Sequence, residues 1–372
     1  MAPAQRSRVM IVDDSAVMRS LLRSVIAAEA GLEVAGTASD GASALNALQS
    51  DHPDLILLDV EMPVMDGLVM LRRLRERGHR MPVIMCSSLT QRGAKVTIEA
   101  LAAGASDYVA KPAGQADREQ ATRALAQELI PKIQALTEKL QGQVIPAASR
   151  MGQPGFAAPI PLSAPSVVAI GVSTGGPAAL DVVLPELPGD FALPVLVVQH
   201  MPEVFTRVFA ERLSRRCALR VCEAAEGEPV RPRTIYIARG NWHMETLAAA
   251  RDGSTPTIHL NQEAPENHCR PAVDRLFRSV AKNYGAGVLG VVLTGMGSDG
   301  LAGCRAIREQ GGTVLAQDQA TSTVWGMPGA VAQAKLAHKV LPLDAIAPEI
   351  VRLAGRSSAA AGARSEPGWA AS

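Results

Sequence analysis

The chain alternates between short, continuous apolar runs and longer amphipathic stretches, and it does so twice. In the first half, apolar runs at 9–12, 55–58 and 82–85 have the length and the continuous apolar composition of strands that are buried on both faces. Amphipathic patterns at 16–28 and 67–77 lie between these runs and predict helices. Strands that alternate with helices predict a parallel sheet with right-handed crossovers.

A second alternation, with apolar runs at 167–170, 195–198 and 288–293, follows a proline-rich segment. A mixed-charge helical pattern over 115–140 leads into residues 143–165, which combine five prolines with Ala, Gly and Ser. Such a composition cannot bury a core and indicates a semi-rigid linker. The pattern therefore predicts an α/β protein with two doubly wound parallel-sheet domains.

Length and composition agree with this division and exclude several classes of function. With 372 residues, the chain exceeds what one ordinary core supports. The formal net charge is +1 and aromatic residues make up 3%, so neither nucleic acid nor a membrane surface is an expected partner. We read no export signal and no bilayer-spanning apolar run, and the five scattered cysteines resemble reduced thiols, so we expect a cytoplasmic protein.

In the first half, acidic residues follow directly after predicted strands. Asp13 and Asp14 follow the first apolar run, and Asp59 follows the second run named above. Ligands of open parallel sheets bind beyond the carboxyl ends of the strands, so these carboxylates should converge. Converging carboxylates need a cation, and a site made only of oxygen suits Mg²⁺. Ser87 and Lys111 also follow apolar runs, so the set predicts phosphoryl transfer to an aspartate.

Taken alone, the Asp13–Asp14 pair would fit a helix cap or a solvated loop equally well. The ordered series of Asp59, Ser87 and the pair Lys111–Pro112 makes that explanation much weaker. On these motifs, residues 8–125 resemble a response-regulator receiver domain, which implies a flavodoxin-like fold. The resemblance further implies a cis bond between Lys111 and Pro112.

The receiver resemblance also implies a role for each site residue. Asp59 would be the phospho-acceptor. The groups that would hold Mg²⁺ are the side chains of Asp13, Asp14 and Asp59 and the backbone carbonyl of Glu61. The groups that would sense the phosphoryl group are Ser87, Lys111 and the switching aromatic Tyr108.

The second half carries a serine in a glycine-rich turn. The segment 171–175, Gly-Val-Ser-Thr-Gly, follows a buried run and precedes an apolar helical pattern at 178–184. It fits the nucleophile elbow, a sharp strand-to-helix turn that exposes Ser173 at a helix N-terminus, where backbone N–H groups favour an anion. By itself the turn would also fit a helix cap or a phosphate-binding loop.

A serine nucleophile needs a base, and the base needs an orienting group. His200 and Asp299 follow the other two apolar runs of this half, so we expect Ser173, His200 and Asp299 to meet from three adjacent strand ends. His243 and His268 are the rival bases, but neither directly follows a buried run. For Asp299 the alternative is a solvated loop carboxylate.

The order Ser, His, Asp differs from the Ser, Asp, His order of α/β-hydrolases. From residue 167 to about residue 354 the chain resembles the Rossmann-like catalytic domain of the chemotaxis protein-glutamate methylesterases, the CheB family. The segments that carry the resemblance are 171–177, 199–206, 209–213, 293–300, 316–322 and 326–328. The resemblance adds the Met296 backbone N–H to the oxyanion hole and implies no cofactor for the esterase step.

Together the resemblances imply a phosphorylation-activated methylesterase of chemotaxis adaptation. It would hydrolyse glutamate 5-O-methyl esters on methyl-accepting chemoreceptors, release methanol and deamidate specific receptor glutamines. Its partners would be these receptors and a chemotaxis histidine kinase, and it would act as a monomer without membrane insertion. The expected division is a receiver domain at 8–125, a helix and Pro/Ala-rich linker at 126–165, a catalytic domain at 166–356 and a disordered tail at 357–372.

Three other classes of protein compete with this interpretation. A receiver with a DNA-binding output predicts a small, basic, helical second half, which this chain lacks. A nucleotide-binding domain predicts a complete phosphate-binding glycine motif around Ser173, and none is present. A scaffold that keeps the triad but acts by binding partners stays open.

Overall fold

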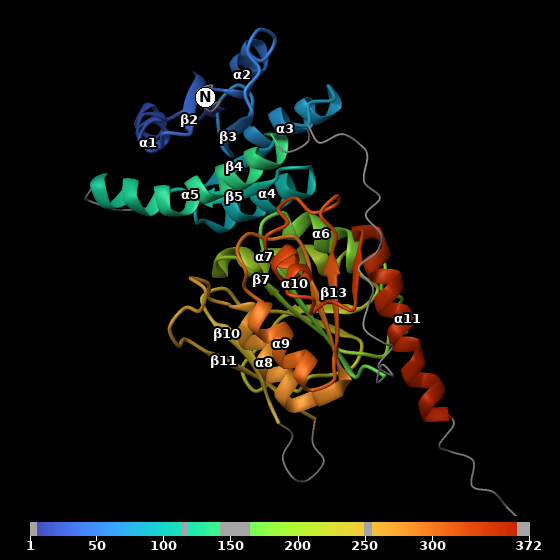
Figure 1. Ribbon diagram of the computed structural model, residues 1–372. Helices are drawn as coiled ribbons and strands as arrows, with labels where there is room; N and C mark the ends of the chain where they lie inside the picture. The colour runs from blue at the N-terminus through green and yellow to red at the C-terminus, as the bar shows by residue number, and fades with distance from the viewer. Residues whose placement is uncertain (1–5, 113–117, 142–163, 249–254, 363–372) are drawn as a thin grey trace, which may run out of the picture. The chain divides into compact units, whose positions relative to one another are not determined.

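The computed structural model describes residues 6–112, 118–141, 164–248 and 255–362 (Figure 1). The chain divides into two compact units, Met1–Met151 and Gly152–Ser372. Each unit contains its own parallel sheet flanked by helices, so the expected fold class of two α/β parallel-sheet domains is confirmed. Among the described residues, no helix is both long and apolar enough to cross a bilayer.

The first unit is built on a five-stranded sheet in the order β2-β1-β3-β4-β5, with every neighbouring pair parallel. The apolar runs become strands because their residues are buried on both faces, and β3 and β4 are buried at every position. The strands are β1 (Ser7–Val12), β2 (Leu32–Ala38), β3 (Leu55–Asp59), β4 (Val83–Ser87) and β5 (Asp107–Ala110). The helices are α1 (Ala16–Ala27), α2 (Gly41–Ala47), α3 (Gly67–Glu76), α4 (Gln91–Ala102) and α5 (Arg118–Gln141).

The second unit is built on a seven-stranded parallel sheet in the order β14-β13-β12-β6-β7-β9-β8, with a separate antiparallel pair β10-β11. The strands are β6 (Val167–Val172), β7 (Val195–Gln199), β8 (Arg220–Glu223), β9 (Thr234–Ile237), β10 (His243–Leu247), β11 (Thr257–Asn261), β12 (Val288–Val292), β13 (Thr313–Gln317) and β14 (Lys339–Leu341). The helices are α6 (Gly176–Val183), α7 (Glu203–Ser214), α8 (Val273–Tyr284), α9 (Leu301–Glu309), α10 (Met327–Gln333) and α11 (Leu343–Gly362), with a 3₁₀ turn at Gly285–Gly287.

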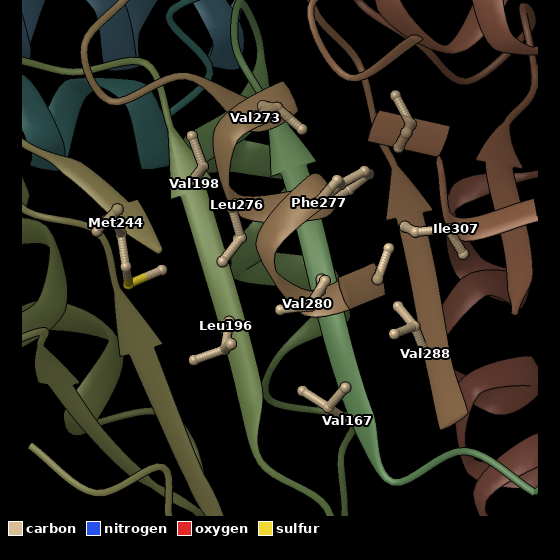
Figure 2. Close-up of a cluster of buried hydrophobic side chains, with 14 of the residues drawn as sticks. Val167, Leu196, Val198, Met244, Val273, Leu276, Phe277, Val280, Val288 and Ile307 are labelled. Atoms are coloured by element: carbon tan, nitrogen blue, oxygen red, sulfur yellow. The ribbon is translucent and has the colours of Figure 1, made fainter. Parts of the chain in front are cut away.

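Helix α8 supplies much of the core on one face of this larger sheet (Figure 2). Its apolar residues recur with the spacing of one helical face, and they pack with side chains from β6, β7 and β12. The helix-borne residues are Val273, Leu276, Phe277 and Val280. Glycines let α8 approach closely, because a Cβ at Gly171 would lie 2.3 Å from a methyl carbon of Val273. The close approach brings the N-terminus of α8 to the carboxyl ends of the strands.

The helices at the domain edges run through two of the expected divisions. Helix α5 begins at Arg118 and continues to Gln141, so one helix crosses the expected boundary between 125 and 126. Helix α11 includes residues 357–362, which the sequence assigned to the tail, and alanine-rich sequence favours helix. Most of the proline-rich segment, 142–163, and the last residues, 363–372, lie outside the described residues.

Candidate active site and phosphorylation site

Three adjacent strands, β12, β6 and β7, bring Ser173, His200 and Asp299 to one edge of the sheet. Ser173 directly follows β6 and His200 directly follows β7, and these strands pair up to their last residues, Val172 and Gln199. The His200 N–H donates to the Val172 carbonyl over 3.2 Å, which continues the pairing by one position. Asp299 lies in the loop between β12 and α9.

The imidazole of His200 is bonded to the carboxylate of Asp299. His200 Nε2 lies 2.8 Å from Asp299 Oδ2. Because an ionised carboxylate only accepts hydrogen bonds, Nε2 carries a proton, and in the neutral ring Nδ1 is the remaining acceptor. Asp299 is buried and also accepts the N–H groups of Val273 (2.7 Å), Asp274 (3.0 Å) and Gly300 (3.0 Å). Two of these donors are the first residues of α8, where the helix dipole favours an anion.

These contacts move the pKa values of both groups. Burial alone would raise the pKa of Asp299, but hydrogen bonds from His200 and the backbone outweigh it and lower that pKa. Burial alone would lower the pKa of His200, but its contacts with Asp299 and Cys269 outweigh it and raise that pKa to about 9. His200 is therefore held as an imidazolium at neutral pH and becomes an effective base as the solution becomes alkaline.

The backbone around Ser173 is fixed by its neighbours. Gln199 Nε2 donates to the carbonyl of Ser173 (3.1 Å) and to the carbonyl of His200 (3.2 Å). The Ser173 N–H donates to the Thr294 carbonyl over 3.0 Å. In the described part of the chain the Ser173 hydroxyl has no hydrogen-bond partner, and catalytic contacts of this kind often form only in the substrate complex.

Two glycines allow the turn after Ser173. Gly175 has a left-handed φ of 77°, which glycine adopts without strain. A Cβ at Gly176 would lie 2.0 Å from Gln199 Oε1, so any side chain there would force Gln199 to move. The Gly-rich pattern therefore serves a sharp strand-to-helix turn, as the nucleophile-elbow interpretation expects.

The rival histidines occupy other environments. His243 is buried in β10, its Nε2 lies 3.1 Å from the Ala264 carbonyl, and its Nδ1 accepts the Ala272 N–H over 3.3 Å. Burial lowers the pKa of His243. His268 is exposed in a turn. Of the three candidates, His200 is the one that contacts Asp299 and follows the strand beside Ser173.

Met296, the predicted oxyanion donor, lies in the loop that packs on Ser173. A Cβ at the neighbouring Gly295 would lie 2.9 Å from Ser173 Cβ. The Gly295 N–H donates a hydrogen bond to the Val324 carbonyl over 3.0 Å. Within the described ranges, the Met296 N–H donates no hydrogen bond, so it is available to an anion at this edge.

Sequence reasoning missed a turn at 266–269 that contacts two triad candidates. Asn267 Nδ2 donates to Asp299 Oδ1 and to Asp274 Oδ2, each over 2.9 Å. Cys269 Sγ lies 3.5 Å from His200 Nδ1. Asn267 and His268 both have positive φ, 52° and 61°, and asparagine tolerates this region well. The Asn-His pair between polar residues was the available signal for a tight turn, but nothing in the sequence placed the turn at the site.

In the first unit, the structure brings Asp13, Asp14 and Asp59 together, with carboxylate oxygens within 4.8 Å of one another. Lys111 Nζ lies 2.7 Å from Asp59 Oδ2 and 2.8 Å from Asp13 Oδ2. The latter contact is an ion pair without hydrogen-bond geometry, so the buried Asp13 Oδ2 lacks a donor. Three carboxylates facing one ammonium, with one orphaned buried oxygen, fit a divalent cation bound through oxygen.

The same contacts shift the pKa values of Asp59 and Lys111. Burial raises the pKa of Asp59, although Lys111 opposes the shift. Burial alone would lower the pKa of Lys111, but Asp13 and Asp59 outweigh it and raise that pKa. Burial therefore makes the charged form of Asp59 unfavourable, while the adjacent Lys111 keeps its positive charge. This combination is expected of a carboxylate that accepts a covalently bound group.

The remaining receiver residues have other contacts in this structure. The Ser87 hydroxyl accepts a hydrogen bond from Thr97 Oγ1 (2.7 Å) and donates to the Ser88 carbonyl (3.2 Å). Tyr108 is buried in β5, with Lys132 Nζ 5.1 Å from its ring centroid. The Glu61 N–H lies 3.4 Å from Asp59 Oδ1, which puts its backbone beside the carboxylates.

The expected cis bond between Lys111 and Pro112 is wrong. Among the described residues, the cis peptide is Arg270–Pro271. The trans form is the ordinary state of an X–Pro bond, favoured by about 0.5–1 kcal/mol.

Comparisons with known proteins cover nearly the whole chain. Residues 168–350 match the model of the CheB methylesterase family, and residues 9–123 match that of the response regulator receiver domain. A protein-glutamate methylesterase/protein-glutamine glutaminase of Trichodesmium erythraeum is 47% identical over 94% of this chain and 99% of its own length. A protein of the same name from a Nocardioides species is also 47% identical, over 94% of this chain and 96% of its own.

Among solved structures, the CheB methylesterase catalytic domain of Thermotoga maritima is 40% identical, with a TM-score of 0.49, and covers 51% of this chain and 100% of that chain. The two relatives match 94% of this chain at an identity that identifies the family. The chain belongs to the CheB methylesterases, hydrolases joined to a response regulator receiver domain.

Proposed function

We propose that this chain hydrolyses glutamate 5-O-methyl esters on methyl-accepting chemotaxis receptors, with Ser173 as nucleophile, His200 as base and Asp299 as orienting carboxylate. The observation that carries the proposal is the 2.8 Å contact between His200 Nε2 and Asp299 Oδ2, at a strand end adjacent to that of Ser173. This contact fixes the tautomer that leaves Nδ1 able to take a proton. The names of the two relatives give the same ester as substrate.

In the proposed reaction, Nδ1 of neutral His200 takes the hydroxyl proton of Ser173 as Oγ attacks the ester carbonyl carbon. The Met296 N–H and the N-terminus of α6 stabilise the oxyanion. The imidazolium then returns its proton to the methoxy oxygen, and methanol leaves. Water, deprotonated by His200, attacks the acyl-enzyme, and His200 returns that proton to Ser173 Oγ as the glutamate product leaves. Because His200 carries every proton transfer, the proposal assigns no cofactor to the esterase step.

The same steps deamidate a glutamine, because the primary amide replaces the methyl ester and ammonia replaces methanol as the leaving group. The relatives' double name, methylesterase and glutaminase, supports including this activity. The proposed substrates are therefore two side chains that differ only in the group expelled.

In the receiver unit, we propose that Asp59 takes a phosphoryl group from a chemotaxis histidine kinase. The side chains of Asp13, Asp14 and Asp59 and the Glu61 carbonyl would hold Mg²⁺, which when bound neutralises charge on the phosphoryl oxygens. Lys111 is already in contact with Asp59 and would pair with the new anion. Ser87 would redirect its hydroxyl proton from the Ser88 carbonyl to a phosphoryl oxygen, and Tyr108 would respond to that change.

Replacement of the proposed nucleophile tests the esterase directly. Ser173→Ala should lower methanol release from methylated receptor at least about 1,000-fold, because the alcohol that attacks the ester is removed. Ser214→Ala is the matched control, since Ser214 is exposed at the end of α7 and its hydroxyl donates to the local Glu211 carbonyl. Methanol release by Ser173→Ala at the rate of Ser214→Ala would refute the assignment.

A further inference from the structure

The turn at 266–269 places a thiol against the histidine nitrogen that the proposed reaction needs. Cys269 Sγ lies 3.5 Å from His200 Nδ1, while Nε2 of the same ring faces Asp299. In the described ranges these three side chains form one of two clusters with metal-ligating atoms within 4.8 Å of one another. The two atoms are within hydrogen-bond distance, and the proposed ester hydrolysis forms no bond to this thiol, so the pair is free for a second use.

The separation of the two atoms is that of two ligands of one tetrahedral metal ion. With a zinc–sulfur bond of about 2.3 Å and a zinc–nitrogen bond of about 2.0–2.1 Å, a tetrahedral angle puts the sulfur and nitrogen about 3.6 Å apart. The observed 3.5 Å matches this edge. The pair could therefore chelate a cation without rearranging the backbone.

The turn itself holds the thiol in place. The Glu266 N–H donates to the Cys269 carbonyl (3.1 Å), and the Cys269 N–H donates to the Glu266 carbonyl (2.9 Å). Arg278 Nη1 and Nη2 bind the two carboxylate oxygens of Glu266 over 2.8 and 2.6 Å, which fixes the turn to α8. Asn267, on the same turn, is bonded to Asp299. A site whose ligands are fixed in advance loses little conformational freedom on binding.

Asp299 has the position of an outer partner of such a metal site. Its Oδ1 accepts from Asn267 and two backbone N–H groups, and its Oδ2 accepts from His200 and the Val273 N–H. A histidine that binds a metal through one nitrogen commonly donates its other N–H to a carboxylate, which fixes the ring. The Asp299–His200 contact supplies that arrangement.

We propose that His200 Nδ1 and Cys269 Sγ form a binding site for a thiophilic divalent cation, for which Zn²⁺ is the probe, and that its occupancy blocks the esterase. The blocking part rests on the proposed function, because the cation occupies the nitrogen that would take the Ser173 proton. Binding releases the thiol proton and, where His200 is an imidazolium, the Nδ1 proton to solvent, and no electron is transferred. Water fills the positions left by two protein ligands, since Cys269 is partly exposed and 13% of the His200 side chain is accessible to solvent.

Cobalt binding tests the site without reference to activity. The full chain, in excess Mg²⁺ to saturate the receiver carboxylates, is titrated with Co²⁺, and the thiolate-to-cobalt charge-transfer absorption is followed. One equivalent should produce the band in the wild type and in Cys217→Ser, since Cys217 is half-buried and belongs to neither cluster. Cys269→Ser should lose the band, and His200→Gln should weaken Co²⁺ binding at least about 10-fold. If Cys269→Ser shows a charge-transfer absorption as strong as that of the wild type, the proposal is overturned.

The inhibition arm measures methanol release against Zn²⁺, with each variant compared with its own metal-free rate. The wild type and Cys217→Ser should be inhibited and should recover on addition of a chelator, whereas Cys269→Ser should need at least about 10-fold more Zn²⁺ for half inhibition. Equal inhibition of Cys269→Ser and wild type would show that Zn²⁺ acts elsewhere. If the wild type binds Co²⁺ through Cys269 but releases no methanol in the absence of added metal, the metal-site proposal stands and the proposed esterase activity is refuted.

Discussion

At the scale of single residues, His200 lies between a carboxylate and a thiol, and these neighbours determine the pH at which it can act as a base. Its pKa is raised to about 9, with Asp299 and Cys269 responsible for the increase against the effect of burial. The proposed base is the neutral ring. The fraction of active enzyme should therefore increase as pH rises through this value.

The pH dependence of methanol release checks this expectation. We expect kcat/KM of the wild type to rise with pH along a limb centred near 9, the pKa of His200. Cys269→Ser removes one of the groups that raise the pKa, so its limb should move to lower pH. The control, Cys217→Ser, should follow the wild type. A wild-type limb centred near the ordinary histidine pKa of about 6.5 would contradict the raised value.

The position of the three proposed triad residues at one sheet edge could be predicted because each follows a buried apolar run, and the run fixes where the chain reaches that edge. Asn267 and Cys269 could not be predicted in the same way. They reach the site through a turn with two left-handed residues, and the position of that turn depends on its ion pair with α8. Ser87 was predicted at the correct strand end, but its hydroxyl direction depends on Thr97 in α4.

At the scale of elements, the turn from β6 into α6 depends on a close contact between Gly176 and the side chain of Gln199. Gly176→Ala would put a Cβ 2.0 Å from Gln199 Oε1. Gln199 would have to move, and it would lose its bonds to the Ser173 and His200 carbonyls. We expect a loss of about 1–3 kcal/mol in the free energy of unfolding and a lower kcat.

The matched control for this substitution is Gly189→Ala, whose Cβ would meet only Ala218 at an ordinary 3.6 Å. Denaturant unfolding and methanol release would be measured on both variants. Gly176→Ala with the stability and rate of Gly189→Ala would show that the turn tolerates a side chain, contrary to the contact described.

The strands that the sequence revealed, such as β3, β6 and β12, are buried on both faces, but β9 and β13 are equally buried and were not identified. Strand β2 was missed because it lies at the edge of its sheet and its middle residues are only partly buried, so its sequence mixes polar and apolar positions. Strand β14, also at an edge, is largely exposed. A continuous apolar run indicates a strand that is buried on both faces, and edge strands are not buried in this way.

At the scale of the whole molecule, the chain combines a phospho-acceptor site and an ester-hydrolysing site in separate units. The proline-rich composition of 143–165 predicted this separation. The size of any effect of one unit on the other could not be predicted, since it depends on contacts that composition does not specify.

Asp59→Asn tests whether the first unit controls the second. Acetyl phosphate should increase methanol release by the wild type and should leave the Asp59→Asn rate unchanged, because the amide cannot take the phosphoryl group. Asp54→Asn is the control, since Asp54 lies before β3 and its carboxylate accepts the Arg8 N–H over 2.7 Å, away from the cluster. A response of Asp59→Asn equal to that of Asp54→Asn would place the phospho-acceptor elsewhere.

Removal of Mg²⁺ should separate the two activities. A chelator should abolish the acetyl phosphate response, because the carboxylates of Asp13, Asp14 and Asp59 would then lack the cation that balances them. The rate without phosphodonor should be unchanged, since the proposed esterase step uses only His200 for proton transfer. A basal rate that falls with the chelator and returns with Mg²⁺ would contradict this division.

Gln199 has a mechanical consequence for the catalytic edge. One amide group holds the carbonyls of both the alcohol-bearing residue and the imidazole-bearing residue, so the ends of β6 and β7 are cross-linked at the point where chemistry is proposed. A displacement of either strand end is passed to the other, so the backbones of Ser173 and His200 move together. Loops around the substrate can then change shape without misaligning the proton transfer.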